Sequence, residues 1–224
     1  MGREVADRRA GTARRRRTGV GAASQIPLAP VRAFAQPPYV DDATELLAAA
    51  PIHAITFGFT SSAYVIGADG EAEMLERLRA RSRGIPVVAS CASIVEALRV
   101  LGAEHVALFD PPWFDDELNA LGAAYYRAVG FNVVSSLSCA LSSDQYAIEP
   151  SELFEFVRRH VPIEAEAVVF GGNGFRVVGV IAALERELER PAVSPNQALL
   201  WAAMRAVGAR TDSITRYGRL LGSS

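Results

Sequence analysis

The strongest constraint on the fold of this chain is an internal repeat. Residues 54–58, Ala-Ile-Thr-Phe-Gly, resemble residues 167–171, Ala-Val-Val-Phe-Gly, at an offset of 113 positions. Each copy continues into small polar residues and glycine, a stretch rich in Glu, Leu and Arg, a short apolar run that begins with proline, and an amphipathic stretch that ends in Arg-x-x-Gly-Ala. A β-α-β-α unit that occurs twice predicts two similar lobes related by a pseudo-twofold axis.

Short apolar runs alternate with amphipathic stretches along most of the chain, which is typical of an α/β protein with parallel sheets covered by helices. We expect strands at 31–35, 54–58, 86–89, 105–109, 132–137, 167–170 and 191–193, and helices at 41–50, 70–83, 93–102, 115–130, 151–160, 175–188 and 197–208. The two-lobed domain is expected to span residues 25–224, with the first lobe at about 54–110 plus the C-terminal tail and the second at about 113–210. The active-site cleft is expected between the lobes.

The N-terminal segment differs from the rest of the chain. Residues 1–24 contain seven arginines, two acidic residues and no apolar periodicity, so we expect them to be disordered. Two alternatives stay open: a basic tail that touches nucleic acid, and a coding sequence that starts in the wrong place. The net charge of the whole chain is −2, which gives no reason to expect a nucleic-acid or membrane partner. Assembly into a homo-oligomer is left open.

Absent and rare residue types exclude several kinds of chemistry. All 23 basic residues are arginine, which excludes a lysine Schiff base and a P-loop. No set of His, Cys and carboxylate residues has the spacing of a metal site, and we expect neither a metal nor a cofactor. The chain has only two cysteines and no apolar run of about 18 residues, which favours a cytoplasmic protein without a membrane span.

Two turns between a strand and the following helix are the candidate ligand-binding elements. In open α/β sheets, ligands bind beyond the carboxyl ends of strands, and N–H groups at a helix start attract anions. The first turn, residues 58–62, offers the hydroxyls of Thr60, Ser61 and Ser62; the second turn, residues 171–176, offers the Asn173 amide and the backbone of Gly172 and Gly174. If the lobes are symmetric, both turns face one cleft, and two facing anion sites suit a dicarboxylate. The alternative is structural, with N-capping at the first turn and a tight connection at the second.

Three further residues at strand ends are candidates for the same cleft. Trp113 follows the strand at 105–109 and forms either a wall of the pocket or part of the core. Cys91 lies near a helix start, where a lowered pKa would make it a nucleophile, although a buried and inert thiol is the commoner case. Asn196 holds the matching place in the second half and is a candidate hydrogen-bond donor.

At these residues the chain resembles the Asp/Glu racemase superfamily, and within it the branch of maleate cis-trans isomerases and arylmalonate decarboxylases. The resemblance runs from about residue 30 to 221 and rests on segments 58–62, 86–102, 113–130, 171–176, 191–208 and 217–220. It implies a cofactor-independent isomerase or decarboxylase with two lobes and one active site between them. In such an enzyme Thr60 and Ser61 would bind a substrate carboxylate and stabilise an enediolate, as an oxyanion hole does.

The chain departs from the pattern of this family at its reactive positions. Phe59 stands where the family has its first cysteine and Gly172 where it has its second, and neither side chain transfers a proton or attacks a double bond. Trp113 replaces an aromatic hydroxyl. The first strand of the family lies near the N-terminus, where this chain has only the Arg-rich stretch, so that strand is either missing or unrecognisable.

Three hypotheses follow from these observations. The first is an isomerase or decarboxylase that acts on a small dicarboxylate without a cysteine. It uses Thr60, Ser61 and Asn173 electrostatically, and its substrate site is lined by Phe59, Ser62, Trp113, Gly172, Gly174, Cys91 and Asn196. The second is a relative that binds a carboxylate without turnover. The third, an unrelated oxidoreductase or nucleotide-binding domain, is disfavoured because the chain has no Gly-x-Gly-x-x-Gly turn followed by an acidic residue.

Overall fold

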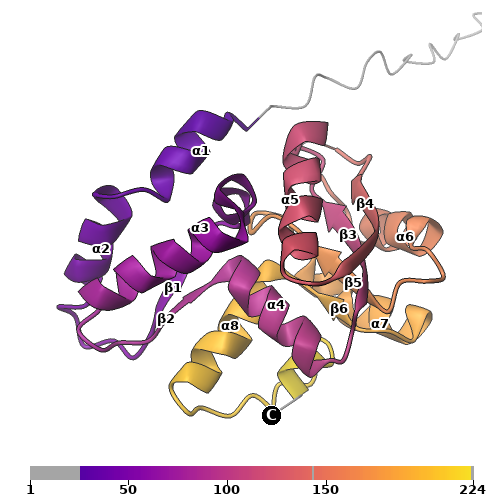
Figure 1. Cartoon of the computed structure of the whole chain (residues 1–224). Helices are drawn as coiled ribbons and strands as arrows, with labels where there is room; N and C mark the ends of the chain where they lie inside the picture. Colours follow the sequence, from indigo (N-terminus) through magenta and orange to yellow (C-terminus); the bar gives the residue numbers. More distant parts are fainter. Residues whose placement is uncertain (1–25, 143, 223–224) are drawn as a thin grey trace, which may run out of the picture.

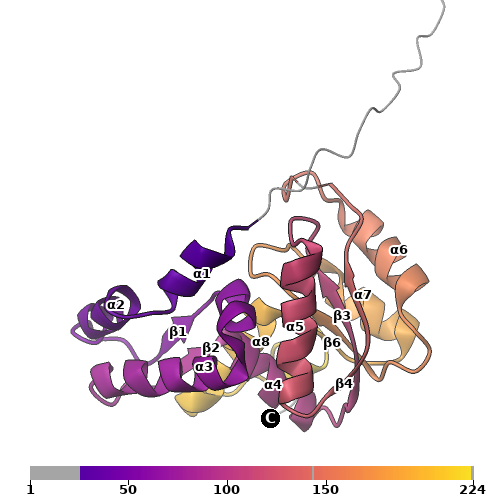
Figure 2. The ribbon, with the colours of Figure 1, turned by 45° about the horizontal axis from the view of Figure 1, so that its top comes forward.

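The computed structural model describes residues 26–142 and 144–222, and it confirms the expected α/β fold with parallel sheets in two lobes (Figures 1 and 2). The expected disorder of residues 1–24 lies outside the described residues. In chain order the elements are α1 (Leu28–Phe34), α2 (Tyr39–Leu47), β1 (Ile55–Phe57), α3 (Thr60–Arg81), β2 (Val87–Ala89), α4 (Ser90–Val100), β3 (His105–Asp110), α5 (Asp116–Ala128), β4 (Asn132–Ser138), α6 (Pro150–His160), β5 (Ala167–Phe170), α7 (Val178–Leu188), β6 (Ala192–Val193), α8 (Pro195–Ala206) and a 3-10 turn, η1 (Leu220–Gly222).

The second lobe is built on a four-stranded parallel sheet with the order β4-β3-β5-β6. Alternate residues of β3 enter different hydrophobic clusters: Val106 and Leu108 pack with α4, α5 and α8, whereas Ala107 and Phe109 pack with α6 and α7. This is the pattern of a parallel strand covered by helices on both faces. The expected boundary is therefore wrong at one point, because β3, assigned from the sequence to the first lobe, pairs with β4 and β5 of the second.

The first lobe is smaller and contains a two-stranded parallel sheet, β1-β2. Helix α8, which the sequence placed in the second lobe, packs against α4 and against both strands of this sheet. The equivalent helices of the two repeats, α4 and α8, thus lie face to face between the two sheets. The pairing of β1 with β2 and of β5 with β6 gives both halves the same strand arrangement, as the repeat predicts.

The strand expected at residues 31–35 is wrong. Residues 31–34 belong to α1 and Ala35 is its C-cap, and no strand precedes β1 in the described part of the chain. Val31 and Ala35, four positions apart, are the buried residues of this segment, which is helical rather than alternating spacing. Pro30 lies in the first turn of α1, where proline is tolerated. In place of that strand, the described chain begins with α1 and α2, both of which pack against α3.

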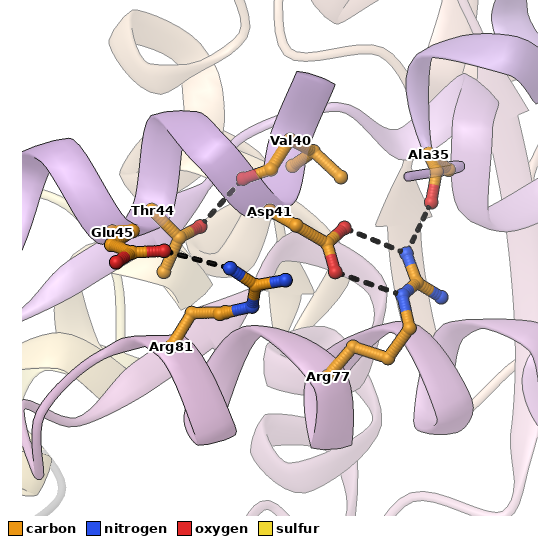
Figure 3. A network of polar contacts seen from close by, with 7 residues as sticks. All are labelled: Ala35, Val40, Asp41, Thr44, Glu45, Arg77 and Arg81. Atoms are coloured by element: carbon orange, nitrogen blue, oxygen red, sulfur yellow. Dashed lines mark hydrogen bonds and ion pairs between the residues drawn. The ribbon is translucent and has the colours of Figure 1, made fainter. Parts of the chain in front are cut away.

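Ion pairs fasten α2 to α3 (Figure 3). The Arg77 guanidinium lies 3.2 Å from the buried Asp41 carboxylate and also donates to the Ala35 carbonyl at 2.9 Å. Arg81 contacts Glu45 at 2.7 Å, but both of these side chains are about half exposed, so this pair adds little stability. The Asp41–Arg77 pair is the stronger tie, because Asp41 is buried and Arg77 is its ion-pair partner among the described residues.

Helix α3 positions the first turn. It begins at Thr60, ten residues before the start expected from the sequence, and it is interrupted at Gly67, whose φ of 75° and ψ of 175° are not helical. Glycine tolerates a positive φ that other residues avoid. The expected helix at 70–83 is therefore the second segment of a longer, kinked helix, and the first segment carries the candidate site residues. No helix of the described residues is long and apolar enough to span a membrane.

Candidate active site

The two turns meet across the boundary between the lobes. The Thr60 N–H donates to Asn173 Oδ1 at 3.0 Å, and the Gly172 N–H donates to Thr60 Oγ1 at 2.9 Å. Thr60 and Asn173 are separated by 113 positions, the offset of the repeat, so equivalent residues of the two halves bond to each other. The structure therefore brings together three residues that the sequence singled out separately.

A cluster of neutral amide and hydroxyl groups surrounds this junction. The Asn173 side chain donates to Ser90 Oγ at 3.0 Å and to Asn196 Oδ1 at 2.9 Å. Asn196 Nδ2 donates in return to the Asn173 carbonyl at 2.9 Å. Ser90 also belongs to this cluster and was not predicted from the sequence, although it follows directly on β2, at the carboxyl end of a parallel strand.

A cavity of about 510 Å³ opens beside this cluster. Asn173, Gly174 and Asn196 line it, together with Tyr146, Glu149 and Arg176. Arg176 belongs to the second turn and is exposed, and it forms no ion pair within the described residues. The cavity thus combines amide groups, the Arg176 guanidinium and the Glu149 carboxylate. The amides and the arginine are donors that suit a carboxylate.

Glycine at position 172 is required by the backbone. Its φ is 72°, and a side-chain carbon there would lie 2.8 Å from Pro111 Cγ. A cysteine at this position would therefore need both a strained backbone and a shift of Pro111. The Trp113 ring lies close by, 3.8 Å from the place that a side chain at Gly174 would take, and it packs edge-on against Phe175 with centroids 5.8 Å apart. Trp113 is half-buried and joins both major hydrophobic clusters.

Three expected site residues point elsewhere. Ser62 is buried and donates to the Val31 carbonyl at 3.3 Å, because it faces α1 on a different side of α3 from Thr60. Ser61 is also buried and does not line the cavity beside Asn173. Phe59 packs edge-on against Phe34 and lines an apolar groove between α2 and β1 instead.

Cys91 is not available for nucleophilic attack. The side chain is fully buried, and its Sγ lies 3.9 Å from the Thr60 carbonyl within the core. Burial raises the pKa of this thiol well above its usual range, and the nearby Glu71 carboxylate adds to the effect. The expectation that Cys91 contributes to the substrate site is wrong, because α4 turns it inward instead of toward the cavity.

A buried carboxyl lies directly behind the second turn, and the sequence analysis missed it. Asp110 ends β3; it accepts a hydrogen bond from Asn119 at 2.7 Å and another from the Tyr64 hydroxyl at 3.3 Å. Its Oδ1 lies 1.8 Å from where a side-chain carbon at Gly171 would be, so only glycine fits there. Burial raises the pKa of Asp110 to about 7. The available signal was an acidic residue at the carboxyl end of an apolar strand.

A second buried carboxyl was missed as well. Glu71 lies on α3 beyond the kink and accepts a hydrogen bond from the Tyr125 hydroxyl of α5. Burial raises its pKa to about 7, although Tyr125 and the backbone N–H groups of Cys91 and Ala92 oppose the rise. Within the described residues no three or more His, Cys, Asp or Glu side chains are grouped to hold a metal ion.

Solved structures with the same fold include isomerases and decarboxylases. A maleate isomerase from Pseudomonas putida S16, in a crystal structure with maleate, superposes with a TM-score of 0.80 at 19% identity over 90% of this chain and 81% of that one. An arylmalonate decarboxylase superposes with a TM-score of 0.74 at 23% identity over 83% and 82% of the two chains. A Nocardia farcinica maleate cis-trans isomerase with a covalent succinylcysteine intermediate gives 0.74 at 22% identity over 87% and 78%. These likenesses confirm the two-lobed fold.

The sequence itself assigns the family. No curated protein matches the chain. The profile of the arylmalonate decarboxylase family, in contrast, matches residues 38–221, which include both turns, the neutral cluster and the two buried carboxyls. The match confirms the resemblance to the branch of decarboxylases and isomerases within the Asp/Glu racemase superfamily: this chain belongs to the arylmalonate decarboxylase family.

Proposed function

We propose that this protein binds a small malonate-type dicarboxylate at the junction of the two turns and catalyses its decarboxylation without a cysteine. The observation that carries the proposal is the junction of the two turns at Thr60, whose N–H donates to Asn173 Oδ1 and whose hydroxyl oxygen accepts from the Gly172 N–H. Fixed donors of this kind stabilise negative charge that develops on a carboxylate, because they need no reorganisation during the reaction.

Binding would begin with an exchange of hydrogen-bond partners. A substrate carboxylate replaces Asn173 Oδ1 as the acceptor of the Thr60 N–H, at the N-terminus of α3, where the helix dipole favours an anion. The freed Asn173 side chain and the Ser90 hydroxyl then serve as further donors. Arg176, at the cavity, attracts the second carboxylate.

The chemistry needs a sink for electrons and a source of a proton. When the bond between the α-carbon and one carboxylate breaks, CO₂ leaves. The electron pair of the broken bond stays with the α-carbon and is delocalised onto the remaining carboxylate, which gives an enediolate. The Thr60 N–H and the Thr60 hydroxyl, which the Gly172 N–H holds in place, stabilise that charge, and a proton from water then gives the monocarboxylate. Since neither Phe59 nor Gly172 delivers a proton to one face, we expect a racemic product.

Cysteine-dependent isomerisation of maleate fits the residues of this site less well than decarboxylation does. The intermediate of the Nocardia farcinica enzyme is a succinylcysteine, which needs a thiol in contact with the substrate. Both cysteines of this chain, Cys91 and Cys139, are buried, and burial raises the pKa of each thiol. Two buried, unpaired cysteines also suit the cytoplasm, which is the compartment that we propose.

Turnover of a prochiral aryl-methylmalonate in D₂O tests the proposal. We expect CO₂ release and a racemic monocarboxylate with deuterium at the α-carbon. Thr60→Val, which keeps the shape but removes the hydroxyl, should lower kcat at least about tenfold. Thr56→Val, an exposed threonine of β1, is the matched control. Absence of CO₂ release at saturating substrate would refute decarboxylation.

Binding without turnover is the second candidate. It is favoured by the neutral character of the cluster, because Thr60, Ser90, Asn173 and Asn196 carry no titratable group. Under this hypothesis, malonate or maleate raises the melting temperature while no product forms. Product formation would rule it out, and the absence of both a thermal shift and a product would rule out both candidates.

A further inference from the structure

Two buried pairs of a carboxyl and a phenol join α3 to the second lobe. Tyr64 of α3 donates to Asp110 of β3, and Tyr125 of α5 donates to Glu71 of α3. The pairs lie on opposite sides of the kink at Gly67, so each segment of α3 has its own attachment. Tyr64 is one helical turn beyond Thr60, which places the first pair directly behind the Thr60–Gly172 hydrogen bond.

Among the described residues, no positive charge lies beside Asp110 to stabilise its ionised form. Tyr64 faces it from α3, Asn119 and Tyr126 from α5, Cys91 from α4 and Cys139 from the end of β4. Within the part of the chain that the structure describes, Asn119 and Tyr64 alone donate hydrogen bonds to the carboxyl. A carboxylate placed among phenols and thiols at zero exposure is costly, and protonation removes that cost.

Glu71 has a similar environment. Tyr125 and Tyr126 face it from α5 and Cys91 from α4, together with the N–H groups of Cys91 and Ala92 at the start of α4. Its Oε1 is buried and has no hydrogen-bond partner in the described residues. The Tyr126 hydroxyl is likewise buried and unpartnered there. No cation within the described residues neutralises either carboxyl.

We propose that Asp110 and Glu71 are positioning residues. In their protonated forms they hold α3 against the second lobe and so keep Thr60 in contact with Gly172. When they ionise, the lobes separate and the anion site is lost. The device makes ligand binding depend on pH. Both carboxyls have a pKa raised to about 7 by burial, whereas an opened interface would return them to water and to lower values. The closed form therefore binds more protons and loses population as the pH rises through about 7.

Hydrogen exchange of the Thr60 and Gly172 amides measures the junction directly, because both N–H groups donate across it. After correction for the intrinsic rate, their protection should fall at least about tenfold between about pH 6 and about pH 8.5. The Val169 amide, in the buried strand β5, serves as an internal reference and should not follow them. Asp110→Asn and Glu71→Gln, neutral mimics of the protonated acids, should each reduce this dependence, and together abolish it.

The affinity for fumarate, whose carboxylates stay ionised over this range, is the second readout, and it rests on the proposed function. Its dissociation constant should rise at least about tenfold over the same interval in the wild type and in Glu73→Gln, an exposed change on α3, but not in the double variant. An equal pH dependence in the wild type and the double variant, or constant protection in the wild type, would overturn the inference. If fumarate fails to bind at any pH, the proposed function is weakened while the exchange data still decide the role of the two carboxyls.

Discussion

Thr60 and Asn173 are at equivalent positions in the two halves, but they have complementary hydrogen-bonding roles. One supplies an N–H and a hydroxyl, and the other an amide oxygen that occupies the N–H. Asn173 therefore occupies the place that a substrate carboxylate would take. At the scale of single residues, we propose that Asn173 Oδ1 occupies the Thr60 N–H until a ligand carboxylate replaces it.

Asn173→Asp should convert that acceptor into a competitor. A carboxylate at position 173 would accept the Thr60 N–H more strongly than the amide does, and its charge would repel an incoming anion. We expect the dissociation constant for malonate, measured by calorimetry, to rise by at least about tenfold. Asn132→Asp, at the exposed start of β4, is the control and should leave binding unchanged.

Gly171→Ala should destabilise the fold. The added carbon would lie 1.8 Å from Asp110 Oδ1 and 3.0 Å from the Tyr64 hydroxyl, so the buried hydrogen bonds behind the turn would have to shift. We expect a loss of about 2 kcal/mol or more in the free energy of unfolding from urea titration. Gly179→Ala, in α7, meets no atom within 4 Å and should be neutral or stabilising. Equal effects of the two changes would contradict this account of Gly171.

Among the elements, α8 has the clearest start signal. Ser194 caps it by accepting from the Gln197 N–H, and the Gln197 side chain accepts from the Ser194 N–H in return. Because α8 lies between the sheets, the stability of this helix bears on both lobes. The Ser194→Ala variant should lower the free energy of unfolding by about 1 kcal/mol, measured by urea titration. The control is Ser213→Ala, which changes an exposed serine of the C-terminal tail. If the two variants lower the free energy of unfolding equally, the capping box contributes little.

The sequence predicts most elements of this fold because their periodicities are local properties. The six strands from β1 to β6 all appear, since short apolar runs bounded by turns have few other stable arrangements. The strand prediction at 31–35 failed because a short apolar run is compatible with a strand as well as with a helix. Pairing partners are not local, so the membership of β3 in the second sheet could not be deduced.

The candidate site was only partly predictable for the same reason. Thr60, Gly172 and Asn173 were found because turns after strands are recognisable in a sequence. Helix phase decides that Ser62 and Cys91 point inward, and the start of α3 was misplaced. Asp110 and Glu71 escaped because a buried carboxyl looks like any other acidic residue until its neighbours are known.

For the whole molecule, the buried acids set the direction of the pH dependence of stability. The pKa values of Asp110 and Glu71 are raised in the folded state, so their contribution is fully present below about pH 4 and is lost as the pH rises toward about 7. Exposed carboxyls with lowered pKa values, such as Glu155 and Glu166, act in the opposite direction, but only below their ordinary pKa.

We therefore expect the free energy of unfolding to be lower at about pH 8 than at about pH 5, by an amount on the order of a few kcal/mol. Urea titrations at the two pH values measure this difference. It should shrink in the Asp110→Asn, Glu71→Gln double variant and persist in Glu73→Gln. Greater stability of the wild type at the higher pH would show that the two acids are ionised in the folded protein.

The position of α8 has a consequence for how the protein is made. The first lobe consists mainly of residues 28–100, but α8, which packs on β1, β2 and α4, is formed by residues 195–206. A ribosome that has released the first lobe must still translate nearly the whole second lobe before this partner emerges. During that interval α8 does not yet cover the apolar face of α4. We therefore expect chaperones that bind apolar helical surfaces to bind the growing chain.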